Sequence, residues 1–112
     1  MNETAKYEFT IVVPVYNEQD NLSRVEEQLS RFLPTARMKA CVLLVNDGSS
    51  DDSLKLMKEI CQRQPDFYYI SSNENHGLST AMKAGSDTVE SKYMGYIDAD
   101  LQTNPEDFNL LL

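Results

Sequence analysis

The sequence contains no tryptophan, a single histidine and only two cysteines among its 112 residues. The cysteines, Cys41 and Cys61, form no C-x-x-C pair, and nothing in the sequence suggests secretion. We therefore expect two buried, reduced thiols and no disulfide, as is usual in a reducing compartment. A lone histidine without an evident partner, here His76, is weak support for histidine-based catalysis.

Long apolar runs are also missing. No segment approaches the roughly 18 consecutive apolar residues of a membrane span. Residues 1–6 (MNETAK) lack the apolar core of a secretory signal. With 41% hydrophobic and 25% charged residues, the sequence predicts one small soluble domain of a cytoplasmic protein.

Positive charge is scarce. Ten lysine and arginine residues stand against 18 aspartate and glutamate residues, which gives a net charge of −8. Recognition of nucleic acid depends on a basic surface, so we expect no nucleic-acid partner. An acidic protein can still bind an anionic ligand when a divalent cation lies between the two sets of negative charge.

Four short apolar runs predict buried strands, at residues 9–15 (FTIVVPV), 41–45 (CVLLV), 67–70 (FYYI) and 93–97 (YMGYI). Between them, apolar residues recur at helical spacing: Leu22, Val25, Leu29, Phe32 and Leu33; Leu54, Met57, Ile60 and Cys61; Leu78, Ala81, Met82 and Gly85. The expected caps are Asn17 or Asp20 for the first helix and Ser49 or Ser50 for the second. Pro105 suits the start of a last helix.

Strands and helices alternate along the whole chain. This order predicts an α/β domain with a parallel sheet and helices on both faces. Ligands of open α/β sheets bind outside the carboxyl ends of the strands. The predicted strands end in polar or acidic residues, so these side chains gather at one edge of the sheet.

The stretch YIDADLQ at residues 96–102 ends the fourth predicted strand. Residues two apart on a strand point to the same side, so Asp98 and Asp100 can face one ligand. Hard divalent cations prefer such oxygen ligands and often bridge to substrate phosphates. The alternative is a solvated acidic strand end that caps the next helix.

Four stretches follow the four strands in order: VPVYNEQDNL, VNDGSSDDS, NHGLSTAMKAG and IDADLQTNPED. With these stretches the chain resembles, over essentially all 112 residues, the nucleotide-sugar-binding part of a family 2 glycosyltransferase. DADLQ with Pro105 and Glu106 most resembles the subgroup that transfers sugars to polyprenyl phosphates, such as dolichyl-phosphate mannose synthases. Asn104 and the pair Ser91-Lys92 depart from the pattern of that subgroup.

The resemblance implies a GT-A fold, a Rossmann-like parallel sheet in the order 3-2-1-4, with the tips of the first and fourth strands side by side. It assigns Asp100 to a Mg²⁺ or Mn²⁺ ion, assisted by Gln102 and Asp98. Asp98 and Asp100 are thus the expected catalytic pair, and Asp98 and Ala99 also contact the donor.

The resemblance also implies a nucleotide pocket. Asp47 is expected to accept a hydrogen bond from the imide nitrogen of the base. The alternative is that Asp47 only forms an Asx turn. Pro14 and Tyr16 are expected to sandwich the base, with Glu18 in polar contact. Gly77 is expected to let the diphosphate approach the turn at residues 75–77 closely.

The implied reaction is inverting transfer of a sugar from a UDP- or GDP-sugar to an acceptor such as a polyprenyl phosphate. The apolar run at residues 108–112 carries no helix-stop signal. We therefore interpret residues 1–112 as the donor-binding part of a truncated domain whose acceptor half is absent. Membrane contact, at the cytoplasmic face, is expected only through segments outside this sequence or a lipid-linked acceptor; homo-oligomerisation stays open.

Three other classes of protein are alternatives to this interpretation, and two of them need motifs that the sequence lacks. A dinucleotide-dependent dehydrogenase needs G-x-G-x-x-G after the first strand, and residues 14–20 contain no glycine. A receiver-like Mg²⁺-binding signalling domain needs an acidic pair there, where this chain has Tyr16 and Asn17. A non-catalytic nucleotide-binding or interaction module stays open as well.

Overall fold

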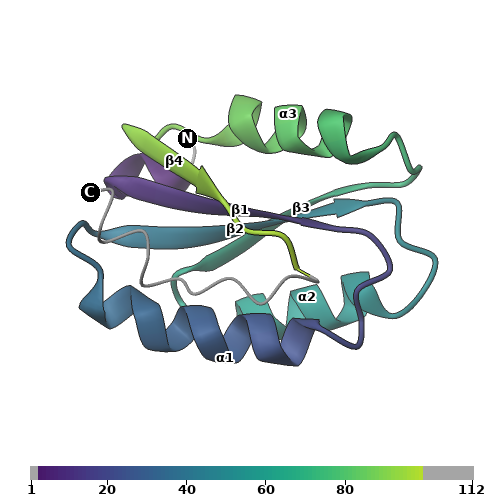
Figure 1. The fold of residues 1–112 in the computed structure, drawn as a ribbon, viewed down its shortest axis with the longest axis horizontal. Helices are drawn as coiled ribbons and strands as arrows, with labels where there is room; N and C mark the ends of the chain where they lie inside the picture. Colours follow the sequence, from purple (N-terminus) through teal and green to yellow (C-terminus); the bar gives the residue numbers. More distant parts are fainter. Residues whose placement is uncertain (1–2, 100–112) are drawn as a thin grey trace.

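The computed structural model describes residues 3–99 as four strands, three α-helices and two short 3₁₀ turns (Figure 1). Asp100, Gln102 and the helix expected at Pro105 lie outside the described residues. In chain order the elements are η1 (Glu3–Lys6), β1 (Phe9–Val15), α1 (Leu22–Phe32), η2 (Leu33–Thr35), β2 (Ala40–Asp47), α2 (Ser53–Arg63), β3 (Phe67–Ser72), α3 (Leu78–Thr88) and β4 (Tyr93–Tyr96).

The four strands form one parallel sheet in the order β3-β2-β1-β4. The expected order is therefore confirmed, with β1 and β4 as neighbours. β1 and β2 occupy the centre, and nearly all their residues are buried because both faces of the sheet are covered. Their β-branched and leucine side chains suit such a doubly covered strand.

Helices α1 and α2 cover one face of the sheet and α3 covers the other (Figure 1). Odd-numbered residues of β1, such as Ile11 and Val13, pack with Leu29 of α1 and Met57 of α2. Val12 points the opposite way and packs with Ala81 of α3. Period-two alternation on β1 thus supplies two separate cores.

Two details of the helices differ from the expectation. Helix α1 begins after Asn21, so neither Asn17 nor Asp20 caps it. Neither serine caps α2, because the oxygen of Ser49 accepts from the Asn17 amide and the Asp51 carboxylate accepts from the Ser53 amide. Asn17 and Ser49 thus connect the β1–α1 and β2–α2 loops instead of capping the nearest helix.

Both cysteines are reduced in the structure. Cys41 is fully buried in β2 and Cys61 is half-buried on α2. Burial raises the pKa of each thiol to about 11, because the thiolate is poorly solvated there. Among the described residues, no helix is long and apolar enough to span a membrane.

Candidate functional site

A cleft of about 300 Å³ opens at the carboxyl ends of the strands, where β1, β2 and β4 meet the start of α3. The cleft brings together residues from the ends of β1 and β2, from α3, and from the segments that follow β1, β3 and β4. Six of the predicted site residues line it: Pro14, Tyr16, Glu18, Asp47, Gly77 and Asp98. Val15, Asn75, Leu78 and Ala81 complete the lining.

Asp47, the last residue of β2, is almost completely buried, with 5% of its surface exposed. Its carboxylate accepts hydrogen bonds from the backbone amides of His76 (2.9 Å) and Gly77 (3.0 Å). It also accepts one from the side-chain amide of Asn75 (3.1 Å). The buried charge is thereby compensated by donors at the N-terminus of α3, where the helix dipole also favours an anion.

These contacts give Asp47 a structural role that the sequence did not reveal. A carboxylate offers about four acceptor positions, so about one remains after these three bonds. The remaining position leaves room for the predicted contact with a base. The alternative of an Asx turn at Asp47 is not observed, because the Asp47 carboxylate bonds to residues 75–77 and not to its own loop.

Gly48 and Gly77 allow the β2–α2 and β3–α3 loops to meet beside Asp47. Gly48 has a φ of +66°, and a Cβ at this residue would lie 2.2 Å from the carbonyl carbon of Glu74. Gly77 has a φ of +94°, but a Cβ there would meet no atom within 4 Å. Gly48 is therefore required by the close approach of two backbones, and Gly77 by its backbone conformation alone.

The loop after β1 is held in place by hydrogen bonds to the segment between β2 and α2 and to the first residue of α2. Asn17 adopts a φ of +52°, which asparagine tolerates better than most residues. Its side-chain oxygen accepts from the amide of Ser50 (2.8 Å), and the amide of Glu18 donates to the hydroxyl of Ser53 (2.9 Å). Tyr16 projects from this fixed loop with 49% of its surface exposed.

Asp98 follows β4 and reaches the cleft, while its neighbours face the interior. Ile97 and Ala99 are buried against the core beneath α1, whereas Asp98 is exposed. Ala99 has 0% of its surface exposed and does not line the cleft. The small side chain of Ala99 fills the core, so the predicted contact of Ala99 with the substrate stays a prediction for its backbone.

The carboxylate of Asp98 is a suitable ligand for Mg²⁺ or Mn²⁺. Its exposed carboxylate supplies a hard oxygen ligand at the rim of the cleft. Among residues 3–99, no three histidine, cysteine or acidic side chains lie close enough to hold a metal alone. Such a cation would take its other ligands from nucleotide phosphates and water, as Mg²⁺ usually does.

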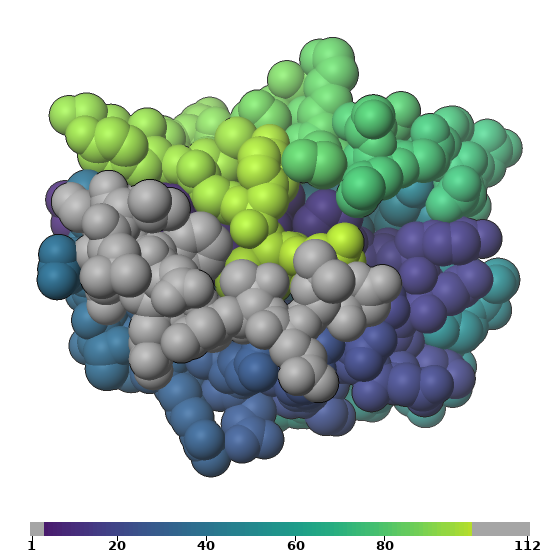
Figure 2. Space-filling model, in the orientation of Figure 1, coloured from purple at the N-terminus to yellow at the C-terminus, as the bar shows by residue number. Residues whose placement is uncertain are grey.

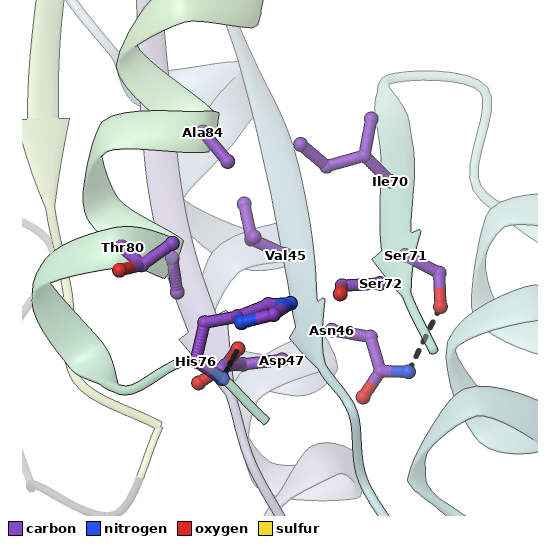
Figure 3. Close-up of a pocket in the computed structure, with 10 residues that line it drawn as sticks. Val45, Asn46, Asp47, Ile70, Ser71, Ser72, His76, Thr80 and Ala84 are labelled. Atoms are coloured by element: carbon purple, nitrogen blue, oxygen red, sulfur yellow. Dashed lines mark hydrogen bonds between the residues drawn. The ribbon is translucent and has the colours of Figure 1, made fainter. Parts of the chain in front are cut away.

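A second, smaller hollow of about 170 Å³ lies on the far side of Asp47, between β3 and α3 (Figure 3). Val45, Ile70 and Ala84 form its apolar wall, and the ring of His76 lies over its mouth (Figure 3). His76 thus borders this hollow and not the cleft. Asn46 is turned away and donates to the hydroxyl of Ser71 (3.0 Å).

Four residues that line the cleft were not predicted as site residues: Val15, Asn75, Leu78 and Ala81. Asn75 belongs to the predicted turn but was not expected to hold Asp47. Leu78 and Ala81 face the cleft from α3, where the helical pattern alone does not separate a buried face from a cleft-lining one. The exposure of Leu78, an apolar residue at a helix start, is a signal available only from the structure.

The sequence profile of the family described as glycosyl transferase family 2 matches residues 10–112. The undecaprenyl-phosphate 4-deoxy-4-formamido-L-arabinose transferase of Klebsiella pneumoniae subsp. pneumoniae is 34% identical over 92% of this chain. An uncharacterized glycosyltransferase of Synechocystis sp. is 35% identical over 88% of it. The chain spans about a third of the length of these relatives, 32% and 31% respectively.

Solved structures show the same fold. The mannosyltransferase PcManGT from Pyrobaculum calidifontis, in complex with GDP-Man and Mn²⁺, superposes with a TM-score of 0.73 at 20% identity. The match covers 94% of this chain and 31% of that chain. S. aureus TarS 1-349 in complex with UDP gives a TM-score of 0.66 at 18% identity, over 83% of this chain and 27% of that chain.

These structures are GT-A glycosyltransferases, so the expected GT-A sheet is confirmed. The family match covers most of the chain, including all four stretches after the strands, and leaves out only Phe9 of β1. The receiver-like and dehydrogenase alternatives are therefore wrong. The chain belongs to glycosyl transferase family 2, whose members are enzymes that transfer sugars.

Proposed function

We propose that the cleft binds a nucleoside-diphosphate sugar together with Mg²⁺ or Mn²⁺, as the donor site of an inverting glycosyltransferase. The observation that carries this proposal is the single cleft joining the ends of β1, β2 and β4. It places Tyr16, Asp47 and Asp98 on three sides of one cavity. A nucleotide can therefore contact all three at once.

The base lies at the β1 and β2 side of the cleft in this proposal. Tyr16 and Pro14 offer a flat ring and a rigid neighbour for stacking. The remaining acceptor position of Asp47 takes an N–H of the base, and Glu18 makes a polar contact with base or ribose. Gly77, whose missing side chain leaves open space, lies where the diphosphate passes.

The diphosphate and cation lie at the β4 side. Asp98 binds the cation or the ribose, and Asp100 and Gln102, outside the described residues, complete the protein ligands. When bound, the cation neutralises negative charge on the departing nucleoside diphosphate. In this proposal the carboxylate of Asp98 at the strand tip helps to orient the leaving group before reaction.

Donor and acceptor classes are inferred from the relatives. PcManGT is solved with GDP-Man and Mn²⁺, and TarS with UDP, so a UDP- or GDP-sugar is the proposed donor. The Klebsiella relative is named for transfer to undecaprenyl phosphate, which supports a polyprenyl phosphate as acceptor. A phosphate acceptor is already anionic and needs little help from a base. Such a lipid places the reaction at the cytoplasmic face of a membrane.

Binding of UDP, GDP and ADP, each with and without Mn²⁺, tests the proposed site. We expect UDP or GDP to bind more tightly than ADP, and Mn²⁺ to strengthen that binding. Tyr16→Ala should weaken it roughly tenfold, because stacking on an aromatic ring contributes about 1–3 kcal/mol per base. Tyr69→Ala is the matched control, since Tyr69 is also exposed but lies on β3 outside the cleft. Equal loss in both variants, or no nucleotide binding, would contradict the proposal.

A further inference from the structure

Helix α1 reaches the carboxylate-bearing end of β4 through one side chain. The guanidinium of Arg24 donates to the carbonyl oxygen of Ala99 at 2.6 Å. Ala99 lies between Asp98 and Asp100 in the sequence and 75 residues from Arg24. A long-range, charge-assisted hydrogen bond therefore holds the backbone directly after Asp98, a proposed metal ligand.

The sheet itself cannot hold this segment. The backbone amide of Ile97 donates to the carbonyl of Val12 at 3.1 Å, and β4 pairs with β1 only as far as Tyr96. In a parallel ladder the next bond would run from the amide of residue 14 to the carbonyl of residue 97. Residue 14 is proline, which has no N–H. The β1 ladder thus ends where Asp98 begins.

Two contacts with α1 take over beyond this point. The side chains of Ile97 and Ala99 are buried in the core that Leu22 and Val25 of α1 also form. The Arg24 guanidinium then binds the Ala99 carbonyl, while its other terminal nitrogen lies 3.5 Å from the Gln28 side-chain oxygen. Figure 2 shows the end of β4 as a yellow band between the green surface of α3 and the blue-violet surface of the first half of the chain.

We propose that Arg24 is a positioning residue for the divalent-cation site: it fixes the backbone next to Asp98. The inference rests on the proposed function, because it presumes that the Asp98 carboxylate binds a cation. In this role Arg24 contacts the Ala99 carbonyl and acts through the geometry of the neighbouring Asp98.

The charge of Arg24 and its proposed positioning role predict opposite effects on cation binding when Arg24 is replaced by alanine. The substitution takes one positive charge from a chain of net charge −8. By charge alone, a cation should then bind more tightly. By the positioning role it should bind more weakly, because the backbone no longer holds Asp98 in one orientation at the cleft. The sign of the effect therefore distinguishes the two roles.

The test compares Arg24→Ala, Arg24→Lys and Arg31→Ala in calorimetric titrations of UDP and GDP with and without Mn²⁺. Arg31 lies on the same helix, with its side chain 78% exposed in a surface pair with Glu27, so its removal matches the change in charge. Arg24→Ala should lower the factor by which Mn²⁺ tightens nucleotide binding by about tenfold. Metal-free binding should fall by less than this factor, because it depends mainly on Tyr16 and Asp47. Arg24→Lys should recover part of the loss, and Arg31→Ala should show none.

Hydrogen exchange of the ligand-free protein provides a second readout. Arg24→Ala should speed exchange in peptides that contain Asp98 and Ala99, whereas Arg31→Ala should not. Unchanged exchange, or tighter Mn²⁺ coupling in Arg24→Ala, would overturn the positioning role. Absence of Mn²⁺ coupling in the unsubstituted protein would contradict the proposed metal site itself, and the exchange result would then decide the role of Arg24 alone.

Discussion

Asp47→Asn is expected to weaken nucleotide binding by about tenfold or more and to destabilise the fold at the same time. The carboxylate accepts three hydrogen bonds from the start of α3, and an amide in its place turns an N–H₂ group toward those donors. At least one buried donor then loses its partner. We expect the free energy of unfolding to fall by about 2 kcal/mol, since hydrogen bonds to charged groups contribute about 1.5–3 kcal/mol.

Denaturant titration and nucleotide titration on the same variant measure the two effects. Asp52→Asn is the matched control, because Asp52 is an exposed carboxylate at the start of α2 whose side chain makes no capping hydrogen bond. Its stability should change by no more than about 0.5 kcal/mol. Full stability of Asp47→Asn would contradict the structural role of Asp47. Unchanged affinity in a folded variant would remove Asp47 from the proposed base contact.

Gly48→Ala is expected to disrupt the meeting of the two loops beside Asp47. The added Cβ would lie 2.2 Å from the Glu74 carbonyl carbon and 2.3 Å from the Asn75 amide nitrogen. Both are backbone atoms, so no side chain can rotate away, and the loop must shift. We expect a loss of roughly 3 kcal/mol or more in stability, at the upper end of ordinary single substitutions. Asn75 then moves away from Asp47, so nucleotide affinity falls too.

Gly77→Ala separates this clash from backbone strain. Gly77 also has a positive φ, yet its added Cβ would meet no atom within 4 Å. Only the strain of the backbone conformation remains, about 1–3 kcal/mol. Thermal and denaturant unfolding of both variants should therefore show the larger loss in Gly48→Ala. Equal losses would mean that the contact between the loops is not tight in solution.

Much of this architecture can be predicted from the sequence, because the local signals agree with the global fold. The β-branched run at 9–15 predicts a central strand with the bounds that the structure shows. The polar ends of the strands predict a shared edge, and six predicted residues do line one cleft there. Strand order itself followed from the resemblance and not from periodicity.

The contacts between loops could not be predicted in this way. Asp47 and Asn75 are 28 residues apart, and no local pattern shows that one binds the other. The same holds for Arg24 and Ala99, which meet only because β4 lies beside β1 above α1. Serine and asparagine side chains were expected to cap their nearest helix, and the structure uses them to bind across to the neighbouring loop.

Metal-dependent nucleotide binding tests the central claim most directly. If Asp98 and Asp100 share the strand tip as proposed, their carboxylates repel each other, so a cation and a diphosphate should each tighten the binding of the other by the same factor. Calorimetric titration of UDP and GDP, with and without Mn²⁺, should show this coupling in the unsubstituted protein. Asp100→Ala should abolish most of the coupling and leave metal-free binding, which depends on Tyr16 and Asp47, largely intact. Equal coupling in both proteins would contradict the account and reduce the two aspartates to a solvated strand end.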